Sequence, residues 1–145
     1  MKKAESILFF DGVCNFCNYT VDYYVKHNNK RNIYYSSLQS EFAKAILPKE
    51  LTKVEEFTTI YFYTNGKIYS QSSAILRSLY HLSFVHKLLL IFLIVPKFIR
   101  DFVYSVISKN RHKIFGKSSS CRIPNEKEKE LFLETKADFE KFSSN

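Results

Sequence analysis

Two cysteines stand where an apolar run gives way to a helical pattern, in the segment ILFFDGVCNFC (residues 7–17). Residues 7–10 have the length of a strand and are apolar at every position, which is typical of an interior strand covered on both faces. Residues 15–28 repeat apolar side chains at helical spacing. The sequence therefore predicts a strand–helix unit with Cys14 and Cys17 in the first turn of the helix.

The following segments extend this unit into a sheet. A polar break precedes a second strand at residues 33–35, expected to lie parallel and adjacent to the first, and a short helix is expected at 40–47. The run TTIYFYTNGKIYSQ has two β-rich halves joined at Asn65-Gly66, which predicts an antiparallel hairpin. A helix capped by Ser72 or Ser73 should follow. The order is βαβ and then ββα, an α/β class with a central mixed sheet.

The second half of the chain predicts an added helical region. Residues 88–95 (LLLIFLIV) end at a proline and are far fewer than the roughly 20 needed to cross a bilayer, so a buried helix is expected. Residues 98–115 repeat apolar side chains on one helical face. We expect one domain over residues 1–125, with a basic helical extension from about 84, and a loosely attached, charged helix or tail over 126–145.

The position and spacing of the two thiols suit redox chemistry. A thiol attacks a disulfide only as its thiolate, and a second thiol must lie within reach to resolve the mixed disulfide. The free N–H groups at a helix start favour negative charge, and a three-residue spacing puts both thiols on one side of the first turn. We therefore expect Cys14, the outer cysteine, to be the nucleophile and Cys17 to resolve.

Asp11 has two interpretations. It lies three residues before Cys14, where a carboxylate can relay a proton to or from a thiol during exchange. Alternatively, its side chain caps the turn while Gly12 supplies the bend. The sequence leaves both open.

Several separated segments together resemble one family. FDGVCNFC is similar to the Asp-Cys-Cys signature of the DCC family of predicted thiol-disulfide oxidoreductases. The later segments that agree with this resemblance are residues 38–40 (LQS), 72–74, 95–104 (VPKFIRDFVY), 110–117 (NRHKIFGK) and 121–124 (CRIP). The resemblance covers about residues 7–124 and implies a thioredoxin-like fold, active cysteines at Cys14 and Cys17, and Asp11 as the accompanying acid. It implies no particular substrate.

The sequence departs from ordinary thioredoxins at one place. Those proteins carry a cis-proline just before the strand that faces the active site, whereas Phe57-Thr58-Thr59 stand there in this chain. Threonine lacks the tolerance of proline for a cis bond, so substrate docking is expected to differ.

The thiols have two other possible uses, as zinc ligands or together with a third cysteine. Tetrahedral zinc would need two more ligands, which Cys121 with His112, His81 or His86 would have to supply, although no second C-x-x-C or regular histidine spacing is present. Cys121 is either a third redox thiol that receives the disulfide from Cys17 or a single cysteine without a role.

Charge and cysteine usage bear on partners and location. Three cysteines, with an N-terminal apolar run too short for a secretory signal, favour a reducing compartment, and we expect the cytoplasm. Residues 86–122 carry eight Lys or Arg against one acid, Asp101, which is typical of a solvated helix face or, with LLLIFLIV, of peripheral membrane contact. No nucleic-acid partner is expected.

The sequence thus favours a thiol-disulfide oxidoreductase that needs no bound cofactor. Its expected partners are a protein or small-molecule disulfide and a thiol electron donor. The competing interpretation is a non-enzymatic binding module, in which the thiols hold zinc or are idle and the basic apolar region docks on a membrane or protein.

Overall fold

A computed structural model describes residues 6–52, 59–117, 119 and 122–144. Its four strands are β1 (Ser6–Phe10), β2 (Tyr34–Ser37), β3 (Tyr61–Thr64) and β4 (Lys67–Ser70). Its α-helices are α1 (Asn15–His27), α2 (Glu41–Ile46), α3 (Lys49–Thr52), α4 (Gln71–Leu79), α5 (Phe84–Lys87), α6 (Lys97–Phe115) and α7 (Lys136–Ser143). Two 3₁₀ helices, η1 (Leu88–Ile94) and η2 (Lys129–Leu131), complete the elements.

The strands form one mixed sheet in the order β2-β1-β3-β4. β1 pairs parallel with β2 and antiparallel with β3, and β3 and β4 form the expected hairpin. The hairpin turns at Asn65 and Gly66, both with positive φ (50° and 74°), a conformation that Asn and Gly tolerate. The predicted βαβ then ββα order is confirmed, and the fold is thioredoxin-like.

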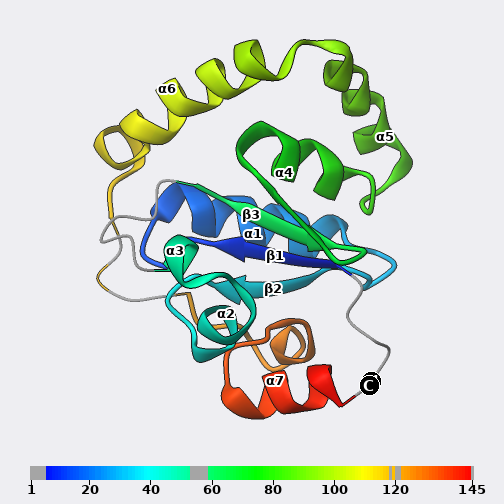
Figure 1. Cartoon of the computed structure of the whole chain (residues 1–145), viewed down its shortest axis with the longest axis vertical. Helices are drawn as coiled ribbons and strands as arrows, with labels where there is room; N and C mark the ends of the chain where they lie inside the picture. Colours follow the sequence, from blue (N-terminus) through cyan, green and yellow to red (C-terminus); the bar gives the residue numbers. More distant parts are fainter. Residues whose placement is uncertain (1–5, 53–58, 118, 120–121, 145) are drawn as a thin grey trace.

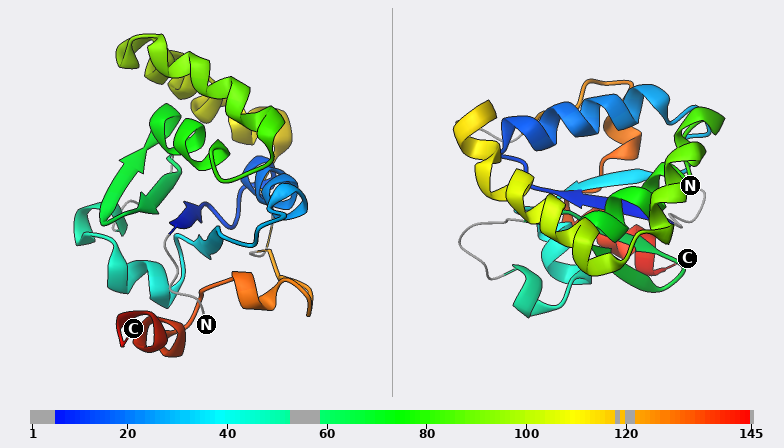
Figure 2. Two further views of the ribbon diagram at one scale, coloured as in Figure 1. Left: turned by 90° about the vertical axis from the view of Figure 1, so that its right-hand side faces the viewer. Right: turned by 90° about the horizontal axis from the view of Figure 1, so that it is seen from above.

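Helices cover both faces of the sheet (Figures 1 and 2). α1 and α4 lie on one face, and α2 with α7 lie on the other. β1 is buried along its whole length, as its unbroken apolar run predicted. α5, η1 and α6 form an arm over α1 and α4 on the side away from the sheet. Among the described residues, no helix combines the length and the hydropathy of a membrane span.

The arm differs from its sequence-based expectation. Residues 88–94 form the 3₁₀ helix η1, and none of them is buried, so the prediction of a buried helix is wrong. The reason is position: η1 lies against α4 in the outermost layer, so only one side of it has protein to pack on. The predicted helix at 98–115 is confirmed as α6.

The predicted cap of α4 is also wrong. The N-cap is Ser70, because β4 runs directly into the helix through Gln71, whose φ is 54°. Ser72 lies inside the first turn and donates a hydrogen bond to Asp101 of α6 instead. Ser72 therefore joins α4 to the arm.

The C-terminal segment is part of the core. Leu131, Phe132 and Leu133 are buried, and the Leu133 N–H donates to the carbonyl of Tyr35 in β2 over 2.9 Å. α7 then packs on α2, with its N-terminus closed by a capping box at Thr135. The expectation of a loosely attached segment after 126 does not describe Leu131–Leu133, because this short apolar run packs at the edge of the sheet beside β2, whereas α7 itself has no buried residue.

Candidate active site

Cys14 and Cys17 lie where β1 ends and α1 begins. Cys14 is the N-cap residue of α1, and its Sγ accepts a hydrogen bond from the Cys17 backbone N–H over 3.4 Å. Both cysteines are free thiols and both are buried. The structure therefore brings the two predicted thiols together at the predicted place, and the helix directs an otherwise unpaired N–H group at Cys14.

The pKa values of the two thiols are shifted in opposite directions. The pKa of Cys14 is lowered to about 6, first by the hydrogen bond from the Cys17 side chain and then by the Cys17 backbone N–H and Arg111, while burial opposes this change. The hydrogen bond to Cys14 and burial raise the pKa of Cys17 above its ordinary range. The surroundings of the pair therefore favour the thiolate on Cys14 and the proton on Cys17.

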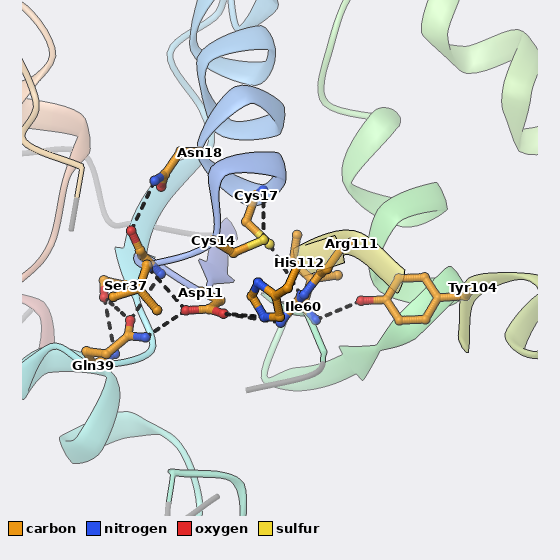
Figure 3. Close-up of polar contacts among 12 residues, drawn as sticks. Asp11, Cys14, Cys17, Asn18, Ser37, Gln39, Ile60, Tyr104, Arg111 and His112 are labelled. Atoms are coloured by element: carbon orange, nitrogen blue, oxygen red, sulfur yellow. Dashed lines mark hydrogen bonds and ion pairs between the residues drawn. The ribbon is translucent and has the colours of Figure 1, made fainter. Parts of the chain in front are cut away.

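Arg111 links the thiols to Asp11 (Figure 3). It comes from the side of α6 that faces the body of the protein, and its guanidinium is buried. One amino group donates to Cys17 Sγ over 3.3 Å, and the other donates to Asp11 Oδ2 over 3.1 Å. A single planar cation thus contacts both a sulfur and a carboxylate, and it supplies positive charge where a Cys17 thiolate would form.

Asp11 is fully engaged by neighbouring groups. Its Oδ1 accepts from the Val13 backbone N–H over 3.2 Å and from Gln39 Nε2 over 2.8 Å, and its Oδ2 faces Arg111. His112 Nε2 lies 4.0 Å from the same Oδ2. The turn-capping interpretation of Asp11 is therefore observed, and its contact with Cys17 runs through Arg111. Its role as a proton relay stays a prediction.

The C-terminal end of α6 covers the site. The Asn15 amide donates to the Phe115 carbonyl over 3.0 Å, and the rings of Phe16 and Phe115 stack with centroids 4.8 Å apart. Beyond the helix end, Lys117 forms an isolated antiparallel bridge with Cys14. This cover leaves Cys14 with no exposed surface.

Sequence reasoning missed the roles of Arg111 and Gln39. Both lie in segments that carry the family resemblance, residues 110–117 and 38–40, but no chemistry was assigned to them. Gln39 also accepts a hydrogen bond from the Gly12 N–H over 3.1 Å, so it holds both the turn and the carboxylate of Asp11. The resemblance was the only signal, because these contacts join residues that lie far apart in sequence.

Tyr104 occupies the approach to β3, and it too was missed. Its hydroxyl accepts a hydrogen bond from the Ile60 N–H over 3.0 Å, and burial raises the pKa of its phenol to about 12. Phe57 and Thr58, part of the segment that stands where thioredoxins have a cis-proline, lie outside the described residues. The described residues contain no cis peptide bond.

The proposed zinc ligands do not converge where the structure describes them. Within residues 6–52, 59–117, 119 and 122–144, no three His, Cys, Asp or Glu side chains are placed to hold a metal ion. His86 bonds to Tyr23 and Ser83, and His81 packs on Phe62. Cys121 lies outside the described residues.

Comparisons with known proteins show which proteins this chain is similar to. The chain is 39% identical to the uncharacterized protein YuxK of Bacillus subtilis over 127 residues, which cover 88% of this chain and 93% of the relative. It is 34% identical to a chloroplastic DCC family protein of Arabidopsis thaliana over 123 residues, 84% of this chain and 72% of the relative. No solved structure matches it significantly. The family model for DCC1-like thiol-disulfide oxidoreductase matches residues 8–117, and the chain therefore belongs to that family.

Proposed function

We propose that the protein is a thiol-disulfide oxidoreductase that works through Cys14 and Cys17. The observation that carries the proposal is the asymmetry of the pair. Cys14 has a lowered pKa at a helix N-terminus, and Cys17 keeps its proton beside the guanidinium of Arg111. A nucleophile and a resolving thiol need this division.

The reaction runs in two exchange steps. The Cys14 thiolate attacks one sulfur of a substrate disulfide, so a Cys14–substrate bond forms, the substrate S–S bond breaks and a substrate thiolate leaves. Cys17 then loses its proton and attacks Cys14 Sγ, which forms the Cys14–Cys17 disulfide and releases the second substrate thiol. The substrate gains two electrons from the protein, one proton from Cys17 and one from water, and a thiol donor later returns two electrons to the protein. The reverse sequence oxidises a substrate dithiol.

Arg111 and Asp11 serve the second step. Cys17 becomes an anion as it attacks, and the Arg111 amino group 3.3 Å away stabilises that charge. Asp11 holds the guanidinium from its other side, so we assign it as a positioning residue that acts through Arg111. If Asp11 instead relays a proton itself, Asp11→Asn will change the pH profile of the resolving step even where Arg111→Lys does not.

Access to Cys14 requires the end of α6 to move. A substrate sulfur must approach Cys14 Sγ in line with the bond that breaks, and the covered cysteine offers no such path. The contacts that must part are the Asn15 hydrogen bond and the Phe16 stack with Phe115, and the backbone bridge between Lys117 and Cys14. These contacts are few, so separation of the cover from the site is the proposed first event.

The proposed setting is the cytoplasm, where a thiol donor keeps both cysteines reduced. The proposed substrates are protein or small-molecule disulfides. The chemistry resides in the two sulfurs, so no bound cofactor is part of the proposal.

A redox titration tests this function. Protein in metal-free buffer is equilibrated across glutathione and dithiothreitol ratios, and alkylated cysteines are located by mass spectrometry. We expect Cys14 and Cys17 to interconvert as a pair between roughly −120 and −270 mV, the range of thioredoxin-like exchangers. Thiols that never pair, or that a stoichiometric metal shields, would instead support the binding module.

Two variants separate the roles of the cysteines. Cys14→Ser should abolish exchange, because it removes the attacking sulfur. Cys17→Ser should accumulate mixed disulfides, because only the resolving step is lost. Equal trapping by both variants would contradict the assignment.

A further inference from the structure

In the arm, helix α6 buries polar side chains and exposes apolar ones, the reverse of an ordinary surface helix. The buried residues of α6 are Ser108 and Arg111, both polar, and they face the body of the protein. Phe98 and Phe102, on its other side, are 75% and 69% exposed. A surface helix normally packs its apolar stripe against the core, so the exposed stripe of α6 calls for a partner outside this chain.

The exposed apolar surface continues from α6 onto α5 and η1. These three elements follow one another along the outer edge of the molecule (Figures 1 and 2). We define the apolar arm face as their exposed large apolar side chains, leaving out Phe115, which stacks on Phe16, and the side chains that line a hollow between the arm and α4, namely Phe92, Ile99, Val103 and Ile107. Its members are Phe84, Val85, Leu88, Leu89, Ile91, Ile94, Phe98, Phe102, Val106 and Ile114.

Positive charge borders this face. Residues 84–117 hold seven Lys or Arg and one acidic residue; one of the seven, Arg111, is buried and paired with Asp11, so it does not contribute to this border. Lys97 lies at the start of α6, and Lys109 and Lys113 lie near its end, all exposed. The single acid, Asp101, is already engaged by Ser72 and Lys97. The chemistry that complements this face is therefore apolar in its centre and anionic at its edges.

This charge pattern distinguishes between two possible binding partners of the apolar arm face, a second copy of the chain and a lipid surface. A second copy of the chain would set one strongly basic region against another, which like-charge repulsion opposes. An anionic lipid surface matches both the apolar centre and the basic edges of this face. Its acyl chains accept the Phe, Leu, Ile and Val side chains, and its phosphates attract the lysines.

We propose that the apolar arm face docks the protein on an anionic lipid bilayer. α6 lies along the surface with its exposed stripe at the boundary between headgroups and acyl chains, and its terminal lysines reach the phosphates. Cys17 contacts Arg111 on the opposite side of the same helix, so the thiols come to lie about one helix diameter, roughly 10 Å, from that boundary. The binding itself does not depend on the redox activity.

Vesicle flotation with the full chain tests the proposal. The probes are vesicles of phosphatidylcholine alone and of phosphatidylcholine with phosphatidylglycerol at about three to one. We expect binding to the anionic vesicles that weakens as salt is raised, and little binding to phosphatidylcholine alone. Failure to bind anionic vesicles overturns the proposal.

Two variants and their controls test the two parts of the face. Phe98→Ser/Phe102→Ser should reduce binding by at least about 10-fold for each side chain withdrawn from the acyl region. Lys109→Ala/Lys113→Ala should reduce it by about 5-fold for each lysine. The matched controls are Tyr19→Ser, an exposed aromatic on α1, and Lys44→Ala/Lys49→Ala on α2 and α3, and we expect both to bind as the wild type does.

Two outcomes separate this proposal from its rivals. If the Phe variants abolish a concentration-dependent dimer while vesicle binding is unchanged, the face is an interface between copies and the proposal is overturned. If the controls weaken binding as much as the arm variants do, the attraction belongs to the net charge of the whole protein, which also overturns it. The redox titration is made without lipid, so its result leaves this test unchanged.

Discussion

Two helices meet at the cysteines, and they present opposite faces to the protein. α1 buries Cys17, Val21 and Tyr24 against the sheet, as an amphipathic helix of this fold does. α6 buries Ser108 and Arg111 and leaves its apolar stripe outside. The difference shows that the buried positions of α6 make polar contacts at the site, while its apolar contacts with the body are limited to partly buried side chains such as Tyr104.

The stability of the protein should then come mostly from the sheet and its two covering layers. The apolar side chains of β1 are fully enclosed, and Leu131 to Leu133 extend that core on the β2 side. The inward side of the arm contributes the ion pair between Arg111 and Asp11 and the hydrogen bond between Tyr104 and Ile60. These contacts fix where the arm sits, and each involves the site or its approach.

The largest effect is expected from Arg111→Ala. This change leaves Asp11 as a buried carboxylate without its cationic partner, which typically costs about 3–5 kcal/mol of unfolding free energy. Urea unfolding of the reduced protein measures it. The double variant Asp11→Asn/Arg111→Met should recover much of the loss, because no buried charge remains unpaired. A loss below about 1 kcal/mol for Arg111→Ala would show that α6 is held by other contacts.

A pair of truncations compares the core with the arm. Leu133→Ala removes a fully enclosed side chain and should cost about 2–5 kcal/mol. Phe102→Ala removes a larger side chain that is 69% exposed on the arm, and we expect a change within about 0.5 kcal/mol. Denaturant midpoints at equal slope measure both. Similar losses in the two variants would break the distinction between the regions.

Local sequence patterns correctly predicted the strands and turns whose conformation depends on neighbouring residues. The unbroken run of residues 7–10 predicted a strand buried on both faces, and Asn65-Gly66 predicted the hairpin, because each depends on neighbouring residues. The positions of Cys14 and Cys17 followed from the same strand–helix junction. Their catalytic roles stay predictions.

Local patterns could not predict which face of α6 turns inward or where the guanidinium of Arg111 lies, for two physical reasons. The helical pattern of residues 98–115 shows that α6 has two faces, but it does not say which one turns inward when the inward side serves a polar site. The contact of Arg111 with Asp11 joins residues 100 positions apart, and an arginine in a basic segment looks like any solvated charge. The burial of Leu131–Leu133 was missed because three apolar residues within charged neighbours give no periodicity.

The N-terminus of α1 should give the protein a stability that depends on pH near neutrality. The pKa of Cys14 is about 6 in the folded protein against about 8.5 for a free cysteine, so folding favours its thiolate. The stabilisation is present above the unfolded pKa and is lost as pH falls toward 6. Cys17, whose pKa is raised, works in the opposite direction once pH rises above about 8.5, so it offsets part of the Cys14 contribution only in that alkaline range.

Two measurements check this expectation. Thiolate absorbance of the reduced protein, taken as a difference from Cys14→Ser, should titrate with a midpoint near pH 6. The unfolding free energy of the wild type relative to Cys14→Ser should rise between pH 6 and 8. A midpoint near 8.5 with a flat stability difference would mean that α1 does nothing to activate its N-cap thiol.

The smallest effect is expected where the two helices touch. Phe115→Ala removes the ring of α6 that stacks on Phe16 of α1, and an aromatic pair of this kind contributes about 0.5–1.5 kcal/mol beyond the area it buries. The cover over Cys14 should then open more often, and the alkylation rate of Cys14 at fixed pH should rise about 2- to 10-fold. The matched control is Phe98→Ala, an exposed aromatic of α6 outside that stack. Equal acceleration by both variants would place the opening motion in the whole arm rather than in its last turn, and an unchanged rate in both would show that small reagents reach Cys14 by another path.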